Sequence, residues 1–195
     1  MGTSIKMESQ TMCTGCPGHC CKINAEVTAF DIARIAILEK LEIIDFIRAC
    51  ESSDEYGFKA LGSKYSFLLM HKNNACIFYN QKDGIGCSIE ESKPSVCLAY
   101  PFSINSGVPV LRDDVLCPPA NFKLADWKKM SKKTIEDYFW EWEQYLLIMD
   151  DWNSFSKGTE KPEEFLKHAL WSIERRKSPL GRLHYKVNIL FRKIL

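Results

Sequence analysis

Four cysteines fall within nine residues near the start of the chain, in the run CTGCPGHCC. Thiolates are soft ligands that suit zinc, copper(I) and iron–sulfur clusters, and one Cys-x2-Cys turn can clasp a single centre. Cys13 and Cys16 form such a pair. The adjacent Cys20 and Cys21 fit one small ion less well, because neighbouring side chains usually point apart. The run therefore predicts a metal or cluster site, with two centres or one multinuclear centre.

The chain has nine cysteines in 195 residues. Their odd number and the absence of an export signal argue against a disulfide framework, and clustered thiols in a reducing compartment are typical of metal ligands or redox groups. Cys50 lies in an apolar pattern that predicts a helix from Ile43 to Cys50, and we interpret it as an ordinary buried cysteine. The predicted ligands are the other eight: Cys13, Cys16, Cys20, Cys21, Cys76, Cys87, Cys97 and Cys117. Eight thiolates are enough for two four-coordinate sites.

Two histidines lie near these cysteines. His19 is inside the opening run, and His71 precedes Cys76 by five residues. Such an imidazole can ligate a metal, donate a hydrogen bond to a ligand or remain exposed. We place ligation below the other two roles for both residues.

Short elements must position the cysteines. The predicted elements are a helix that starts after Thr28, strands over 65–70 and 76–80, a short helix over 93–100 and a hairpin with strands over 102–104 and 108–111. Thr28 and Asp31 have the spacing of a capping box, and the short helix carries Cys97. Beyond Cys117, apolar residues at three- and four-residue spacing predict an amphipathic helix over 131–152, and Pro162 begins another that continues to Arg175.

These elements predict an α+β protein. A small cysteine-rich, metal-stapled region with short hairpins and helices is expected over residues 1–120. A helical C-terminal extension over residues 121–195 is expected to pack on it.

Charge and hydropathy exclude some classes of function. The chain has 26 basic and 25 acidic residues, a formal charge of +1, which argues against nucleic-acid binding through bulk charge. No stretch approaches the roughly 20 apolar residues of a membrane-spanning helix, and the first residues lack the apolar run of a secretory signal. We therefore expect a cytoplasmic protein without a membrane span.

The ordered cysteine series resembles the YkgJ-type cysteine-cluster family. The resemblance runs from about Cys13 to Cys117 and is carried by the opening run, by Cys76-Ile-Phe and by CSIEESKPSVCLAYPF over 87–102. That family is described as a zinc- or iron-chelating domain, and flagellin lysine N-methylases contain a similar domain. This chain has Lys93-Pro94 where relatives often have Arg-Pro, and Leu98 where they often have arginine. The resemblance therefore implies metal binding by the cysteines more directly than it implies an activity.

The functional expectation follows from the thiols. No glycine-rich phosphate loop and no Gly-x-Ser-x-Gly motif is present, and the cysteine gaps of two and then three reverse the order of radical S-adenosylmethionine enzymes. We predict one or two [4Fe-4S] centres with a redox, structural or partner-docking role, and a protein partner or protein substrate. The alternatives are a structural zinc protein, with the same ligand count, and an enzyme or subunit of the lysine N-methylation type, implied by the resemblance.

Overall fold

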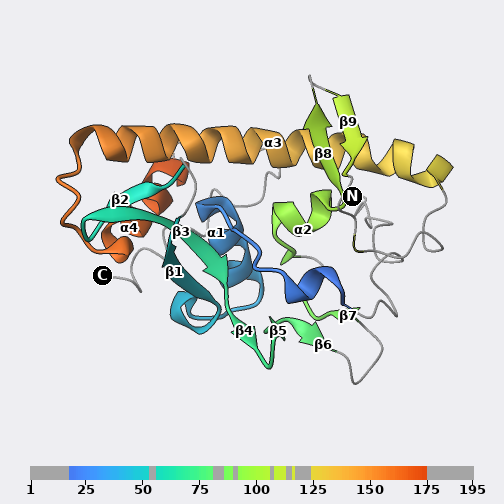
Figure 1. The fold of residues 1–195 in the computed structure, drawn as a ribbon, viewed down its shortest axis with the longest axis horizontal. Coiled ribbons are helices and arrows are strands. Elements are labelled where there is room, and N and C mark those ends of the chain that lie inside the picture. Colours follow the sequence, from blue (N-terminus) through green and yellow to red (C-terminus); the bar gives the residue numbers. More distant parts are fainter. Residues whose placement is uncertain are drawn as a thin grey trace, which may run out of the picture.

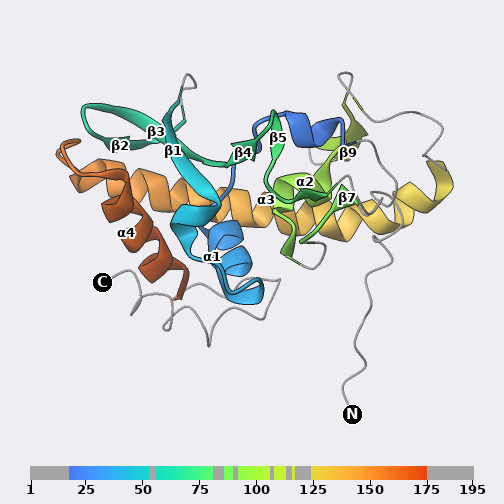
Figure 2. The same ribbon diagram turned by 90° about the horizontal axis from the view of Figure 1, so that it is seen from below.

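The computed structural model describes residues 18–52, 56–80, 86–89, 92–105, 108–112, 116 and 124–174 (Figures 1 and 2). Its helices are η2 (Cys20–Lys22), α1 (Ala29–Leu38), η3 (Ile43–Asp45), α2 (Ser95–Ala99), α3 (Leu124–Phe155) and α4 (Pro162–Glu174). Its strands are β1 (Ile47–Glu51), β2 (Phe58–Ala60), β3 (Ser63–Leu69), β4 (His71–Lys72), β5 (Ala75–Cys76), β6 (Tyr79–Asn80), β7 (Gly86–Cys87), β8 (Phe102–Asn105) and β9 (Val108–Leu111). The chain is an α+β protein with short antiparallel hairpins and a helical C-terminal part, as predicted.

The main sheet has three antiparallel strands in the order β1-β3-β2. The segment that leaves η2 runs beside β3, where the amide of Val27 donates to the carbonyl of Phe67 at 2.9 Å and the amide of Leu69 donates to the carbonyl of Ala25 at 3.0 Å. The sheet therefore fixes the path of the chain between the first cysteines and α1.

Helix α1 begins at the predicted capping box. Thr28 accepts a hydrogen bond from the Asp31 amide, and the Asp31 carboxylate accepts one from the Thr28 amide. Apolar residues of α1 such as Ile32 and Ile35 are fully buried in the core. The capping box starts the helix, and burial of its apolar residues keeps it in place.

The C-terminal helices close the core over the sheet. Helix α3 runs along the length of the molecule, and α4 folds back beneath one of its ends (Figure 1). Phe165 of α4 is fully buried and stacks on Phe58 of β2 with ring centroids 4.1 Å apart. The indole nitrogen of Trp152 in α3 donates to the carbonyl of Lys59 at 2.8 Å. Both late helices were predicted, and α3 is longer than its apolar pattern indicated.

The predicted helix from Ile43 to Cys50 is wrong. The turn η3 ends at Asp45, and the chain then enters β1, where Cys50 pairs with Ser66 of β3. A short apolar run does not distinguish a helix from a buried strand. Pairing along the whole of β1 with the longer β3 decides the conformation here.

The remaining short elements gather on the side of the molecule away from α4. Figures 1 and 2 both place η2, β5, β7 and α2 there, near the β8–β9 hairpin. The predicted strand over 76–80 is divided, since β5 ends at Cys76 and β6 begins at Tyr79.

Among the described residues, no helix combines the length and apolarity needed to cross a membrane.

Candidate metal centre

Five of the eight predicted ligands belong to the described residues. They are Cys20 and Cys21 in η2, Cys76 in β5, Cys87 in β7 and Cys97 in α2. The other three, Cys13, Cys16 and Cys117, lie outside the described residues. No described cysteine forms a disulfide.

The turn that carries Cys20 and Cys21 depends on Gly18. Its φ of +71° is in the left-handed region, which favours glycine. The carbonyl of Gly18 accepts from the Cys21 amide at 3.0 Å, and the carbonyl of Cys20 accepts from the Ile23 amide at 3.1 Å. These two bonds hold both thiol-bearing residues in one tight turn.

Gly18 also connects the cysteine turn to the hairpin that carries Cys87. A Cβ at this position would lie 2.3 Å from Cε2 of Tyr79, so the backbone packs directly on that ring. Tyr79 of β6 is the register partner of Cys87 in β7. The packing of Gly18 on Tyr79 therefore places the turn that carries Cys20 and Cys21 beside the β6–β7 hairpin that carries Cys87.

Cys76 lies at the end of a tight hairpin. Asn73 and Asn74 have positive φ values of 54° and 61°, and they join β4 to β5. This turn places His71 directly opposite Cys76, and β5 packs against η2. Nε2 of His71 is buried and has no hydrogen-bond partner. In the sequence, His71 was notable only because it precedes Cys76 by five residues. The hairpin makes His71 a direct cross-strand neighbour of Cys76.

The described thiols influence one another. A hydrogen bond with Cys20 is the largest cause that raises the pKa of the Cys21 thiol, followed by burial and by the charges of Cys20, Cys76 and Cys97. Burial, followed by the charges of Cys76, Cys20 and Cys87, raises the pKa of Cys97 well above its usual value. Cys97 keeps exposed surface of its own, but the protein packed around it excludes much of the water that would stabilise a thiolate.

Cys20 and Cys21 act on each other, since a hydrogen bond with Cys20 raises the pKa of the Cys21 thiol. That the pair serves two centres or one multinuclear centre stays a prediction.

The donor set fits a soft cation. Burial and neighbouring charges keep these thiols protonated, and a bound cation displaces the protons and offsets the repulsion between the thiolates that form. The described thiols gather without closing a ligand shell, because no three described His, Cys, Asp or Glu side chains form a group that could hold an ion. Completion of a shell requires movement of these thiols or ligands from the rest of the chain.

Cys50 lies apart from this group of elements. It is on β1 in the main sheet, opposite Ser66, rather than on one of the short elements that carry the other described thiols. Cys50 is half-buried rather than fully buried as predicted. Its lack of a ligand role remains a prediction, and its position on β1 makes it a useful control.

Sequence analysis missed the polar residues that hold α2. Asp31 was recognised as a capping residue of α1, but it also accepts from the amide of Ser95 at 2.7 Å. Arg34 bonds to both Asp31 and Glu141 of α3. The Thr28–Asp31 spacing was the only local signal, since Ser95 and Glu141 are distant along the sequence.

The comparisons with known proteins agree with this donor set. The family model CxxCxxCC, described as "Putative zinc- or iron-chelating domain", matches residues 12–135, more than half of the chain. Neither a curated protein nor a solved structure matches the chain.

Proposed function

The chain belongs to the CxxCxxCC family of zinc- or iron-chelating domains, and on that premise we propose that eight of its cysteines hold one or two [4Fe-4S] centres. The role of the centres is redox, structural or partner docking. The proposed ligands are Cys13, Cys16, Cys20, Cys21, Cys76, Cys87, Cys97 and Cys117.

One observation carries the proposal: thiols from separate elements influence one another although their positions along the chain are far apart. The charges of Cys20, Cys76 and Cys87 all act on Cys97. In a fold that gathers thiols in this way without bonding them as disulfides, burial and the charges of neighbouring thiolates make each thiolate costly to form. Binding of a soft metal offsets that cost.

Chain connectivity supports participation of the three ligands outside the described residues. Gly18 follows Cys16 by two residues, and consecutive Cα atoms are about 3.8 Å apart. The amide of Leu116, which precedes Cys117, donates to the hydroxyl of Tyr100 at 2.6 Å, and Tyr100 follows Cys97 by three residues. Short connections therefore join Cys16 and Cys117 to segments that carry described thiols.

The adjacent thiols favour iron–sulfur over zinc. Neighbouring side chains rarely serve one small ion, so Cys20 and Cys21 are better used by two centres or by one multinuclear centre. Two zinc sites with four cysteines apiece have the same ligand count and are the alternative. When bound, an iron–sulfur centre supplies electron transfer, and structural zinc supplies a cross-link. We also propose that residues 1–120 form the metal-binding unit on which residues 121–195 pack.

Anaerobic purification, followed by visible absorption and analysis of iron, sulfide and zinc, tests the proposal. We expect a coloured protein with matching iron and sulfide in the wild type and in Cys50→Ser, and loss of both in Cys97→Ser. A colourless protein with stoichiometric zinc would refute the cluster and leave a zinc site. Absence of both metals would refute the metal-binding function.

A redox titration separates the proposed roles. A centre that cycles reversibly at a physiological potential supports electron transfer or redox sensing. A centre that does not cycle, in a protein that unfolds on chelation, supports a structural role.

A further inference from the structure

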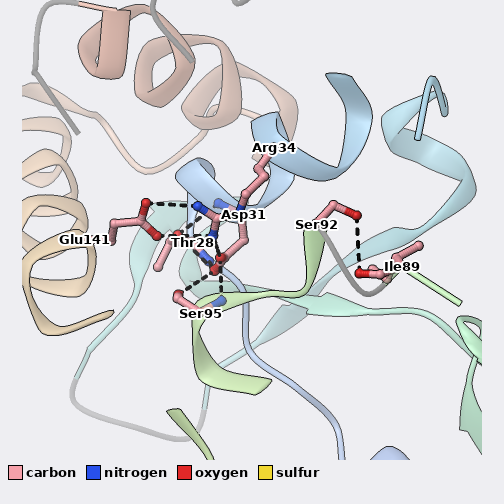
Figure 3. Close-up of polar contacts among 7 residues, drawn as sticks. All are labelled: Thr28, Asp31, Arg34, Ile89, Ser92, Ser95 and Glu141. Atoms are coloured by element: carbon pink, nitrogen blue, oxygen red, sulfur yellow. Dashed lines mark hydrogen bonds and ion pairs between the residues drawn. The ribbon is translucent and has the colours of Figure 1, made fainter. Parts of the chain in front are cut away.

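One buried carboxylate joins the starts of two helices. Asp31 is 1% exposed, and its Oδ2 accepts from the amide and the hydroxyl of Thr28, both at 3.0 Å. The same carboxylate accepts from the Ser95 amide at 2.7 Å and from the Ser95 hydroxyl at 3.2 Å (Figure 3). Asp31 therefore caps α1 and also anchors the first residue of α2.

A second contact fixes the segment that leads into α2. The hydroxyl of Ser92, a fully buried residue, bonds to the carboxylate of Glu39 at the end of α1. The chain before Cys97 is thus attached to α1 at two points, Ser92 and Ser95.

The anchor extends to α3 through an ion pair. Arg34 bonds to Asp31 and makes two bonds, of 3.0 and 3.2 Å, to the carboxylate of Glu141 (Figure 3). Glu141 is fully buried and Arg34 is 7% exposed. Burial lowers the pKa of Arg34, but Asp31 and Glu141 more than compensate, and the net shift is upward. The guanidinium therefore remains charged and links α1 to α3.

Helix α2 needs such an anchor. It spans only Ser95–Ala99, and a helix of this length is unstable without tertiary contacts. Cys97 lies two residues after Ser95, so the bonds to Ser95 determine where the thiol is presented. The charge of Asp31 also raises the pKa of Cys97, after burial and the charges of the other thiols.

We propose that Asp31, Arg34 and Glu141 form a positioning triad that presents Cys97 to the thiols of η2 and β5. Because Glu141 belongs to α3, the triad also links metal affinity to the docking of that helix. Linkage is reciprocal, so metal binding must stabilise the docking of α3 by as much as docking strengthens metal binding. This inference rests on the proposed function.

A buried ion network can also serve stability alone. Such a role would lower the thermal stability of the metal-free and metal-loaded protein together, with metal affinity unchanged. A positioning role would lower the affinity and the increase in melting temperature that metal produces. The two quantities distinguish the roles.

The test uses cobalt(II) binding to the full chain under anaerobic conditions, measured by thiolate-to-cobalt absorption in competition with a chelator. The variants are Asp31→Asn and Glu141→Gln, and the matched control is Ile35→Val, a fully buried position in the same helix that makes none of these polar contacts. Loss of an outer contact to a ligand typically costs about 10- to 100-fold in metal affinity. We expect a loss of that order in Asp31→Asn and Glu141→Gln, and affinity within about twofold of wild type in Ile35→Val.

Each outcome bears on one claim. A wild-type protein that shows no thiolate-to-cobalt absorption and contains no iron or zinc as purified would refute the proposed metal site itself. A wild type that binds cobalt, with both charge variants at wild-type affinity, would overturn the triad alone. If the charge variants do not fold, Ser95→Pro decides, because it removes both the amide and the hydroxyl donor to Asp31 at the first position of a helix, where proline is tolerated. Reduced affinity in Ser95→Pro supports the anchor, and unchanged affinity overturns it.

Discussion

Gly18→Ala tests the packing that joins the opening run to the Cys87 hairpin. The substitution adds one methyl group where φ is +71° and where the new carbon would lie 2.3 Å from the Tyr79 ring. Gly158 provides a matched control, because its φ is +75° and a Cβ added there would meet nothing within 4 Å. The control therefore carries the backbone cost without the collision.

The two costs can be separated. An L-residue in the left-handed region costs about 1–2 kcal/mol, which applies to both substitutions. Overpacking adds about 1–3 kcal/mol, which applies to Gly18→Ala alone. If the turn moves to relieve the collision, the extra cost appears as weaker metal binding of roughly 5- to 150-fold, since about 1.4 kcal/mol is tenfold.

Denaturant unfolding of the metal-free protein and a chelator competition for the metal measure the two effects. We expect Gly18→Ala to lose both stability and affinity, and Gly158→Ala to lose stability only. Replacement of Tyr79 by alanine in the Gly18→Ala background should restore part of the affinity, because the two residues are coupled. Equal behaviour of the two glycine variants would refute the reasoning.

Three further predictions concern the thiols and the fold. Because the pKa values of Cys21, Cys76 and Cys97 are raised, these thiols are protonated at neutral pH without metal. Metal binding should therefore release protons and tighten as pH rises. Calorimetry in buffers of different ionisation enthalpy measures the number of protons released, and binding without proton release would contradict the prediction. Chelation, or Cys16→Ser, should unfold the cysteine-rich region, and unchanged thermal melting after complete metal removal would oppose the stapling role. Hydrogen bonds from the Glu160 amide and from the Ser156 hydroxyl lower the pKa of the Glu160 carboxyl from 4.5 to about 2. The ionised carboxylate therefore stabilises the fold above pH 4.5, and this stabilisation is lost as pH falls towards 2. The difference in melting temperature between wild type and Glu160→Gln should shrink over that range, and a constant difference would exclude this contribution of Glu160.

Much of the fold could be predicted because local signals and tertiary packing agree. The capping box at Thr28, the β-rich run in β3 and Pro162 at the start of α4 each mark an element that the structure contains. The region before Cys50 could not be predicted, because its apolar residues fit a helix and a buried strand equally well. Pairing with β3 decided it, and that pairing is not visible in a local pattern.

The candidate site shows the same division. Types and spacing of the cysteines identified the donors, and the structure gathers five of them on short elements. The residues that position those elements were not identifiable, because the partners of Asp31 lie on α2 and α3. Their contacts depend on the fold rather than on sequence spacing.

The alternative of lysine N-methylation stays a prediction, for which S-adenosylmethionine binding by calorimetry is the test.

X-ray absorption of the anaerobically purified chain tests the central claim most directly, because it reports the metal and the atoms bound to it. We predict an iron edge with a shell of sulfur atoms at about 2.3 Å and iron neighbours beyond it, and loss of that signal in Cys97→Ser. A shell dominated by nitrogen or oxygen at about 2.0–2.2 Å would contradict ligation by the gathered thiols.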